Sequence, residues 1–289
     1  MSVLLTGATG FIGRHLLARL GGEHEVVAIA RSDPPAELAG LARWIRHDLA
    51  TPLDRAALPA RVDTIVHLAQ SPRYRDFPDG ATDVFALNVA APAALLDYAR
   101  AAGAERFVLC STGGVYGLND ERVREGHSVS PLNFYLASKY AAEVLLVPYR
   151  EVLHTVVLRP FFVYGAGQRG MLVASLAARV VGGEEVTVDG DPGLRVNPVH
   201  VRDAARAIAA AVALEGSDVV NVAGDEAVTI TELVQRVAAV AGVDAEIVHR
   251  GDGPAGDLLG DNSRMKDVLG VAPEVALDDG LREVVDELR

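Results

Sequence analysis

The chain has 289 residues, of which 50% are hydrophobic and 23% are charged, and its formal net charge is −12. This length and composition predict a globular protein with one large domain or two unequal ones. The acidic balance argues against a nucleic-acid partner, because nucleic-acid binding relies on clustered Lys and Arg. The sequence has no apolar run long enough to span a membrane, so no membrane partner is expected.

The start of the chain and its single cysteine indicate a cytoplasmic protein. Residues 1–5 lack a basic stretch before their apolar residues, which favours a strand over a signal peptide. Cys110 has no second cysteine to pair with, which suits a reducing compartment. Because it follows the apolar residues 107–109, we expect a buried structural thiol.

Short β-branched stretches alternate with longer amphipathic stretches over the first two thirds of the chain. Strands are expected at residues 3–6, 25–30, 44–47, 64–69, 106–111 and 155–159, and helices at 11–20, 84–102 and 134–149. This alternation predicts an α/β fold in which a doubly wound parallel sheet, a Rossmann sheet, carries helices on both faces.

The rhythm changes after Tyr164. We expect a helix at 171–181, a strand at 186–188, a turn at 189–193, a return strand at 194–201 and helices at 203–214, 229–241 and 281–288. Thr229 and Glu232 have the spacing of a capping box. Residues 1–164, completed by 196–222, are the expected dinucleotide-binding domain. Residues 165–195 and 223–289 are the expected smaller substrate-binding lobe.

A glycine-rich loop joins the first expected strand to the first expected helix. Gly7 permits a tight turn, Gly10 lets backbone N–H groups approach a pyrophosphate, and Gly13 permits close packing of helix on strand. This context predicts dinucleotide binding. The expected cofactor-binding residues of the loop are Gly7, Thr9, Gly10, Phe11, Ile12 and Gly13.

In a dinucleotide-binding sheet, the residue at the end of the second strand contacts the adenosine ribose of the cofactor. An acidic residue there favours NAD, whereas this strand ends in Ala30 and Arg31. A guanidinium suits a 2′-phosphate, so we expect NADP(H) to be preferred over NAD(H). Arg31 as a solvated surface charge, with Asp33 on the ribose, is the alternative. Further cofactor contacts are expected at Asp48 and Leu49 after the third strand, and at the end of the fourth strand, at Leu68, Ala69 and Gln70.

Tyr135 and Lys139 are spaced four residues apart on an expected helix, so their side chains share a face. Only two lysines occur in the chain, Lys139 and Lys266, while arginine supplies the remaining cationic side chains. A nearby ammonium lowers a tyrosine pKa, which would allow Tyr135 to exchange a proton with a carbonyl–alcohol pair. Ser111 and Thr112 end the fifth strand, where a hydroxyl can donate to a developing oxyanion.

With these motifs in their order, nearly the whole chain resembles the extended short-chain dehydrogenase/reductases, a family of nucleotide-sugar epimerases, dehydratases and ketoreductases. The resemblance implies that Thr112, Tyr135 and Lys139 are catalytic and that Ser111, Tyr135, Lys139, Pro160 and Val163 contact the cofactor. It implies a substrate site of Thr112, Gly113, Tyr135, Phe162, Arg195 and Arg250, with the two arginines on a nucleotide diphosphate. It also implies a homodimer, and the site requires no metal.

Two residues depart from the family pattern. Phe162 stands where members often carry an Asn that helps bind the nucleotide sugar, which leaves the substrate open. Gly113 and Gly114 follow Thr112 where 4,6-dehydratases carry an Asp–Glu pair, so dehydration is not expected.

The leading hypothesis is hydride transfer at a sugar carbon of a nucleotide sugar, by epimerisation or by reduction of a keto-sugar. The alternatives are an NADPH-dependent reductase of a small or polyketide-type ketone, and a non-enzymatic scaffold that senses NAD(P).

Overall fold

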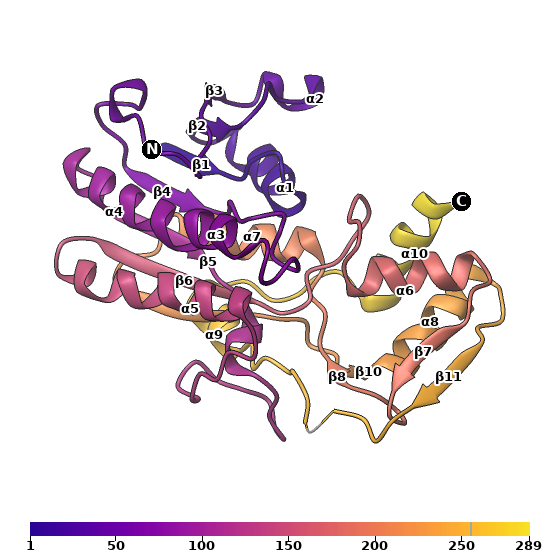
Figure 1. The fold of residues 1–289 in the computed structure, drawn as a ribbon. Coiled ribbons are helices and arrows are strands. Elements are labelled where there is room, and N and C mark those ends of the chain that lie inside the picture. Colours follow the sequence, from indigo (N-terminus) through magenta and orange to yellow (C-terminus); the bar gives the residue numbers. More distant parts are fainter. Residues whose placement is uncertain (255) are drawn as a thin grey trace. The chain divides into compact units, whose positions relative to one another are not determined.

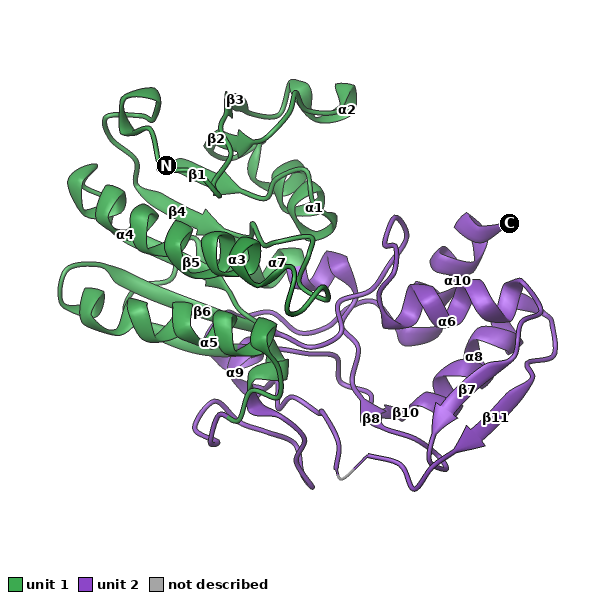
Figure 2. Ribbon diagram, in the orientation of Figure 1, with its two compact units in different colours: residues 1–115, 130–159, 205–220 green, residues 116–129, 160–204, 221–289 purple. Residues whose placement is uncertain are grey.

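A computed structural model of the chain describes residues 1–254 and 256–289, which form two compact units (Figure 2). Unit 1 contains residues 1–115, 130–159 and 205–220, and unit 2 contains residues 116–129, 160–204 and 221–289. Residues 116–129 therefore belong to unit 2, whereas the sequence analysis assigned them to the dinucleotide-binding domain. The role of the second unit in binding substrate stays a prediction.

The centre of unit 1 is a sheet with the strand order β3-β2-β1-β4-β5-β6-β9 (Figure 1). Its strands are β1 (Ser2–Thr6), β2 (Glu25–Ala30), β3 (Arg43–Arg46), β4 (Thr64–His67), β5 (Arg106–Cys110), β6 (His154–Pro160) and β9 (Asp218–Val222). The pairs from β3 to β6 are parallel. The strand order reverses between β1 and β4, and such a switch point is where doubly wound sheets bind dinucleotides. The predicted fold is confirmed.

Helices cover this sheet and bury its apolar side chains. They are α1 (Phe11–Leu20), α2 (Ala36–Ala39), α3 (Ala81–Phe85), α4 (Ala91–Ala101), α5 (Phe134–Leu146) and α7 (Val201–Ala211), with a π-helical turn η2 (Ala86–Ala90) and short 3-10 turns η1 (Arg55–Ala57), η3 (Gly113–Tyr116) and η4 (Val147–Glu151). Leu95 and Leu96 of α4 and Leu146 of α5 pack with strand residues such as Ile65 and Phe107 in one core cluster.

Unit 2 combines two small sheets with helices. Its elements are α6 (Leu172–Val181), β7 (Val186–Asp189), β8 (Arg195–Val196), β10 (Val228–Thr229), α8 (Ile230–Ala241), β11 (Ile247–Arg250), α9 (Ser263–Asp267) and α10 (Leu277–Leu288). Of the helices, α6, α8 and α10 pack against one another. Strand β7 pairs with β11 in parallel, and β8 pairs with β10 antiparallel. The predicted capping box is confirmed, because the Glu232 N–H donates to Thr229 Oγ1 (3.0 Å) and the Thr229 N–H donates to Glu232 Oε2 (2.8 Å).

The predicted return strand at 194–201 is wrong. Only Arg195–Val196 is a strand, and it pairs with β10 instead of folding back on β7. Pro198 has no N–H to donate to a ladder. The buried Asn197 amide instead donates to the carbonyls of Gly224 (2.9 Å) and Gly260 (2.8 Å), and α7 begins at Val201.

Within the described residues, no helix combines the length and the hydropathy that a membrane crossing requires.

Candidate functional site

The loop between β1 and α1 has a geometry that its glycines make possible. Gly7 adopts φ +72° and accepts a hydrogen bond from the Gly10 N–H at 3.0 Å. A Cβ on Gly7 would lie 2.7 Å from the Ala69 nitrogen, and one on Gly13 would lie 2.0 Å from the Gly7 oxygen. Any larger residue at these two positions would force the backbone apart.

The first turn of α1 suits a pyrophosphate. Its N-cap is Gly10, no side chain in the described part of the chain caps it, and no acidic residue lies in the first turn. The first N–H groups of a helix lack intrahelical partners and carry partial positive charge, which favours an anion. The residues of this loop therefore fit a dinucleotide cofactor.

The residues after β4 are fixed against the same loop. The Leu68 N–H donates to the Thr6 carbonyl (3.2 Å), and the Ala69 N–H donates to Thr6 Oγ1 (3.3 Å). Thr6 Oγ1 also hydrogen-bonds His67 Nδ1 at 2.8 Å. Burial, and secondly the charge of Lys139, lower the pKa of His67 to about 3, so this imidazole is neutral.

Tyr135 and Lys139 lie on one face of α5, as expected, and reach the ends of two neighbouring strands. The Asn133 side chain caps α5 by accepting the Leu136 N–H at 2.9 Å, which places Tyr135 in the first turn. The Tyr135 hydroxyl donates to Gln70 Oε1 at 3.0 Å, beyond β4. The buried Lys139 ammonium donates to the Cys110 carbonyl at 2.5 Å, where β5 ends.

The expected lowering of the Tyr135 pKa by Lys139 is not found. Burial first, and then Cys110 and Tyr74, raise the pKa of Tyr135. Burial also lowers the pKa of Lys139, partly offset by Cys110 and Glu143. The physical reason is that a desolvated ammonium directed at a carbonyl gives little stabilisation to a phenolate, which is itself desolvated. Tyr135 in this structure is a neutral phenol, and so a proton donor.

The two hydroxyls after β5 have different partners. The buried Ser111 hydroxyl donates to the Glu143 carboxylate, which is held in turn by Arg159. Thr112 is half-buried, and its Oγ1 accepts the Gly114 N–H at 3.2 Å, so its hydroxyl proton can still be donated to a ligand. Gly113 begins the turn η3.

Of the residues expected to contact the adenosine, those that follow β2 are exposed, as is Asp48, and Leu49 is buried in the core. Arg31 follows β2 and is exposed, as is Asp33. The exposed Asp48 carboxylate accepts the Ala50 N–H at 3.0 Å, which forms a local turn. The Leu49 side chain is buried in the core cluster of unit 1, so any contact with a cofactor would come from its backbone.

The predicted substrate arginines lie in separate sheets of unit 2. Arg195 on β8 is half-exposed and forms an ion pair with Asp257, with Nη2 2.5 Å and Nε 2.7 Å from the same carboxylate oxygen. Arg250 on β11 is 66% exposed and lies 3.3 Å from Glu185. The two arginines thus have different carboxylate partners, Asp257 and Glu185.

The segment that follows β6 contains the remaining predicted residues. Pro160 is buried at the end of β6, and the Val163 carbonyl accepts the Gln168 side-chain amide at 2.6 Å. Phe162 adopts φ +44°, a left-handed conformation that is uncommon for residues other than Gly and Asn. Its ring packs against the helical core of unit 2.

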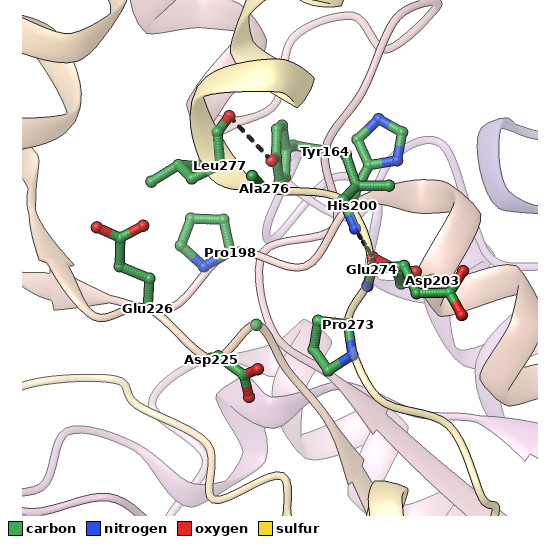
Figure 3. A pocket seen from close by; sticks show the side chains of 12 residues that line it. Tyr164, Pro198, His200, Asp203, Asp225, Glu226, Pro273, Glu274, Ala276 and Leu277 are labelled. Carbon is green, nitrogen blue, oxygen red and sulfur yellow. Dashed lines mark hydrogen bonds between the residues drawn. The ribbon is translucent and has the colours of Figure 1, made fainter.

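Unit 2 also holds a cavity of about 290 Å³ whose walls include Tyr164, His200 and Asp203 (Figure 3). The buried Asp203 carboxylate accepts the N–H groups of Glu274 and Val275, both at 3.1 Å, and the Tyr164 hydroxyl donates to the Leu277 carbonyl at 3.3 Å. None of the predicted site residues is among those that line it in the described part of the chain. These contacts give its polar walls a structural role.

The sequence profile of the NAD dependent epimerase/dehydratase family matches residues 3–223. The chain belongs to this family. The resemblance to the extended short-chain dehydrogenases is thereby confirmed, and the protein is an NAD(P)-dependent enzyme of that group.

Relatives and solved structures match over nearly the whole chain. A dTDP-4-dehydro-6-deoxy-D-allose reductase of Streptomyces bikiniensis is 33% identical over 98% of this chain and 94% of its own length. A Bacillus subtilis protein described as an uncharacterized UDP-glucose epimerase is 31% identical over 97% of this chain and 96% of its own. The structure of a UDP-glucuronic acid 4-epimerase from Bacillus cereus, in complex with UDP-glucuronic acid and NAD, has a TM-score of 0.89 at 27% identity and covers 100% of this chain and 99% of that one.

MoeE5 in complex with UDP-glucose and NAD has a TM-score of 0.86 at 32% identity, with 99% and 98% of the two chains covered. By their descriptions, the other three proteins are nucleotide-sugar epimerases or a reductase. Together these similarities bear out the expected reaction class, NAD(P)-dependent hydride transfer at a nucleotide sugar.

Two features of the site were missed by sequence reasoning. Gln70 was assigned to the cofactor but contacts the Tyr135 hydroxyl. Glu143 and Arg159 form a buried pair beside Ser111 that no prediction named. A signal was present for Glu143, which stands four residues after Lys139 and so continues the face of α5 that carries Tyr135.

Proposed function

We propose that the protein is a nucleotide-sugar epimerase that oxidises and re-reduces one ring carbon of a UDP-hexose. The observation that carries this proposal is the placement of Tyr135 and Lys139 at the ends of β4 and β5, next to the glycine loop. The choice of epimerase is supported by the structural similarity to proteins bound to UDP-glucuronic acid or UDP-glucose.

The glycine loop and the first turn of α1 would hold the pyrophosphate of a nicotinamide dinucleotide, which when bound accepts and returns the hydride. Arg31 supports a preference for NADP(H), because a guanidinium at the end of β2 suits a 2′-phosphate. Lys139 would bind the hydroxyls of the nicotinamide ribose. Its ammonium has three N–H groups, so it can donate to the ribose while it donates to the Cys110 carbonyl.

Tyr135 would be the acid–base residue. Its phenol gives a proton to the substrate oxygen when a carbonyl is reduced and takes a proton back when an alcohol is oxidised. Thr112 would donate a hydrogen bond to the same oxygen and stabilise its developing charge. In unit 2, Arg195 and Arg250 would bind the diphosphate, with Arg195 exchanging Asp257 for phosphate oxygens.

The test is turnover of UDP-glucose and UDP-glucuronic acid with added NAD⁺ or NADP⁺, with the products resolved by NMR. We expect the C4 epimer to form without net consumption of cofactor. Tyr135→Phe should lower kcat by at least about 100-fold, because it removes the group that accepts the substrate proton during oxidation and returns it during reduction. Tyr149→Phe on η4 is the matched control and should retain wild-type turnover. Undiminished epimerisation by Tyr135→Phe would overturn the assigned role.

A second candidate is a reductase of a 4-keto nucleotide sugar. It is favoured by Arg31 and by the 33% identity to the dTDP-4-dehydro-6-deoxy-D-allose reductase. This activity consumes one NADPH per product, which absorbance at 340 nm reports directly. A non-nucleotide ketone as substrate, which Phe162 keeps open, would leave turnover intact in the Arg195→Ala and Arg250→Ala variants.

We further propose that the protein acts as a cytoplasmic homodimer. Val144 of α5 and Val147 of η4 are 49% and 51% exposed, which leaves an apolar surface on these elements. Light scattering coupled to size exclusion would show a monomer mass if this is incorrect.

A further inference from the structure

The Tyr135 hydroxyl has a protein partner that the assigned catalytic roles leave unused. Tyr135 donates to Gln70 Oε1 at 3.0 Å, and Gln70 stands 65 residues earlier in the chain. Gln70 is exposed, so its own amide could be hydrogen-bonded by solvent without the phenol. The contact joins the proposed acid–base atom to a side chain that carries both an acceptor and donors.

The backbone that carries Gln70 is anchored in the glycine loop. Ala69, its neighbour, donates its N–H to Thr6 Oγ1 at 3.3 Å and lies against the α-carbon of Gly7. The position of the Gln70 amide is therefore coupled to the loop that suits the cofactor pyrophosphate.

Aromatic contacts from residues 70–77, the segment that begins with Gln70, hold the first turn of α5. The rings of Tyr74 and Tyr135 lie 5.1 Å apart at an interplanar angle of 50°, and those of Phe77 and Phe134 are stacked at 5.3 Å. Aromatic pairs at such distances are attractive. Residues 70–77 thus fix both the ring of Tyr135 and the direction of its hydroxyl.

We propose that Gln70 is a positioning residue that keeps the Tyr135 oxygen in its reacting place in both of its protonation states. The proposal rests on the acid–base role assigned to Tyr135. A neutral phenol donates to the amide oxygen, as in this structure. A phenolate has only lone pairs to offer, and the same amide can turn its NH₂ group toward it.

This switch suits a reaction that runs in both directions on one substrate. In the reducing direction the carbonyl carbon would gain the hydride that a bound reduced nicotinamide supplies, while the O–H bond of Tyr135 breaks and its proton bonds to the substrate oxygen. The amide N–H of Gln70 would then donate to the phenolate. In the oxidising direction the substrate carbon would give up a hydride to the bound oxidised nicotinamide, while the substrate O–H bond breaks and its proton returns to the Tyr135 phenolate. The phenol would then donate again to the Gln70 oxygen. A side chain that can only accept would assist one state alone.

Gln70→Glu is the sharpest test, because a carboxylate of the same size accepts but does not donate. A neighbouring negative charge raises the pKa of Tyr135. The other titratable groups that face Tyr135 are Tyr74 from the loop, Cys110 at the end of β5 and Lys139 one helical turn away, and the variant leaves them in place. The Gln235→Glu variant on α8, where Gln235 is exposed, is the matched control.

We expect Gln70→Glu to slow the alcohol-oxidation half-reaction by about 10-fold or more at neutral pH, and the keto-reduction half-reaction by much less. The rising limb of the oxidation pH profile should move to higher pH by about one unit, with KM changed by less than about threefold. Gln70→Met, which offers neither group, should slow both directions. Equal slowing of both half-reactions by Gln70→Glu, with no shift of the pH profile, would overturn the proposal.

A second measurement does not depend on turnover. In protein labelled with ¹³C at the tyrosine ζ carbon, the Tyr135 signal is assigned by its loss in Tyr135→Phe. With NAD⁺ added, we expect Gln70→Met to move this signal and Gln70→Glu to delay its titration to higher pH, while Gln235→Glu matches wild type. An unchanged Tyr135 signal in both Gln70 variants would refute the proposal, and this outcome can be observed without any substrate. Absence of turnover in the wild-type enzyme with a normal NMR response would refute only the proposed function.

Discussion

Arg159 and Glu143 form a two-point ion pair inside unit 1. The Arg159 Nε atom lies 3.1 and 3.2 Å from the two carboxylate oxygens, and its Nη2 lies 2.5 Å from one of them. Both side chains are almost completely buried, at 5% and 6% exposure. Because the carboxylate also accepts the Ser111 hydroxyl, this pair connects α5 and β6 to the residue that precedes Thr112.

Breaking this pair should be costly. Arg159→Met leaves an uncompensated buried carboxylate, which we expect to lower the free energy of unfolding by about 3–5 kcal/mol. The double variant with Glu143→Met replaces both charges by apolar groups and should recover part of that loss. Urea denaturation of the two single variants and the double variant measures the coupling. Additive losses in the double variant would contradict the prediction.

His67 should make stability depend on pH. Its folded-state pKa of about 3 lies below the ordinary value of 6.5, so the unfolded chain binds a proton that the folded protein excludes. The free energy of unfolding is therefore not reduced by this group above pH 6.5. As the pH falls from 6.5 toward 3, protonation of His67 in the unfolded chain lowers the free energy of unfolding by about 1.4 kcal/mol per pH unit. His67→Asn should flatten this part of the curve. Unfolding free energies of the two proteins between pH 7 and 4 test this, and parallel curves would refute it.

Gly13 should be irreplaceable for cofactor binding. A methyl group there would meet the Gly7 oxygen at 2.0 Å and the Ala8 α-carbon at 2.8 Å, so Gly13→Ala must displace α1 from the loop. We expect NAD⁺ affinity to fall by more than about 10-fold. At Gly22, a Cβ would meet nothing within 4 Å, and Gly22→Ala is the control. Calorimetric titration gives both affinities, and equal values for the two variants would speak against this geometry.

Arg31 should select between the two cofactors. We expect Arg31→Ala to weaken NADP⁺ binding by about 10-fold or more, through loss of a charged hydrogen bond to the 2′-phosphate, and to leave NAD⁺ binding nearly unchanged. Arg19→Ala, which removes an exposed arginine from the last turn of α1, should affect neither. Tighter NAD⁺ than NADP⁺ binding by the wild-type protein would reverse the assignment.

Sequence periodicity predicted most of the sheet of unit 1, because most of its strands are short apolar runs bounded by turn residues. Strand β2 and helix α1 have the predicted bounds, and β1 differs by one residue. Strands β9 and β11 were not predicted. Residues 247–250, which form β11, are short and end in two polar residues, so the pairing with β7 defines this strand more than its own pattern does.

Within the site, local spacing predicted the shared face of Tyr135 and Lys139, because a helix fixes that geometry. It did not predict that Lys139 would donate to the Cys110 carbonyl or that Gln70 would meet the Tyr135 hydroxyl. Both contacts join segments distant in sequence, and they depend on how far β4 and β5 extend beneath α5. Pairings of that kind follow from strand register, which spacing alone does not determine.

The rarity of lysine gives the molecule an unusual surface chemistry. Lys139 is 3% exposed, whereas the Lys266 side chain is 39% exposed beside Asp225. Lys266 is therefore the lysine that amine-directed reagents reach. Attachment to a solid support through lysine would hold each molecule at this point of unit 2 and leave the buried ammonium of Lys139 unmodified.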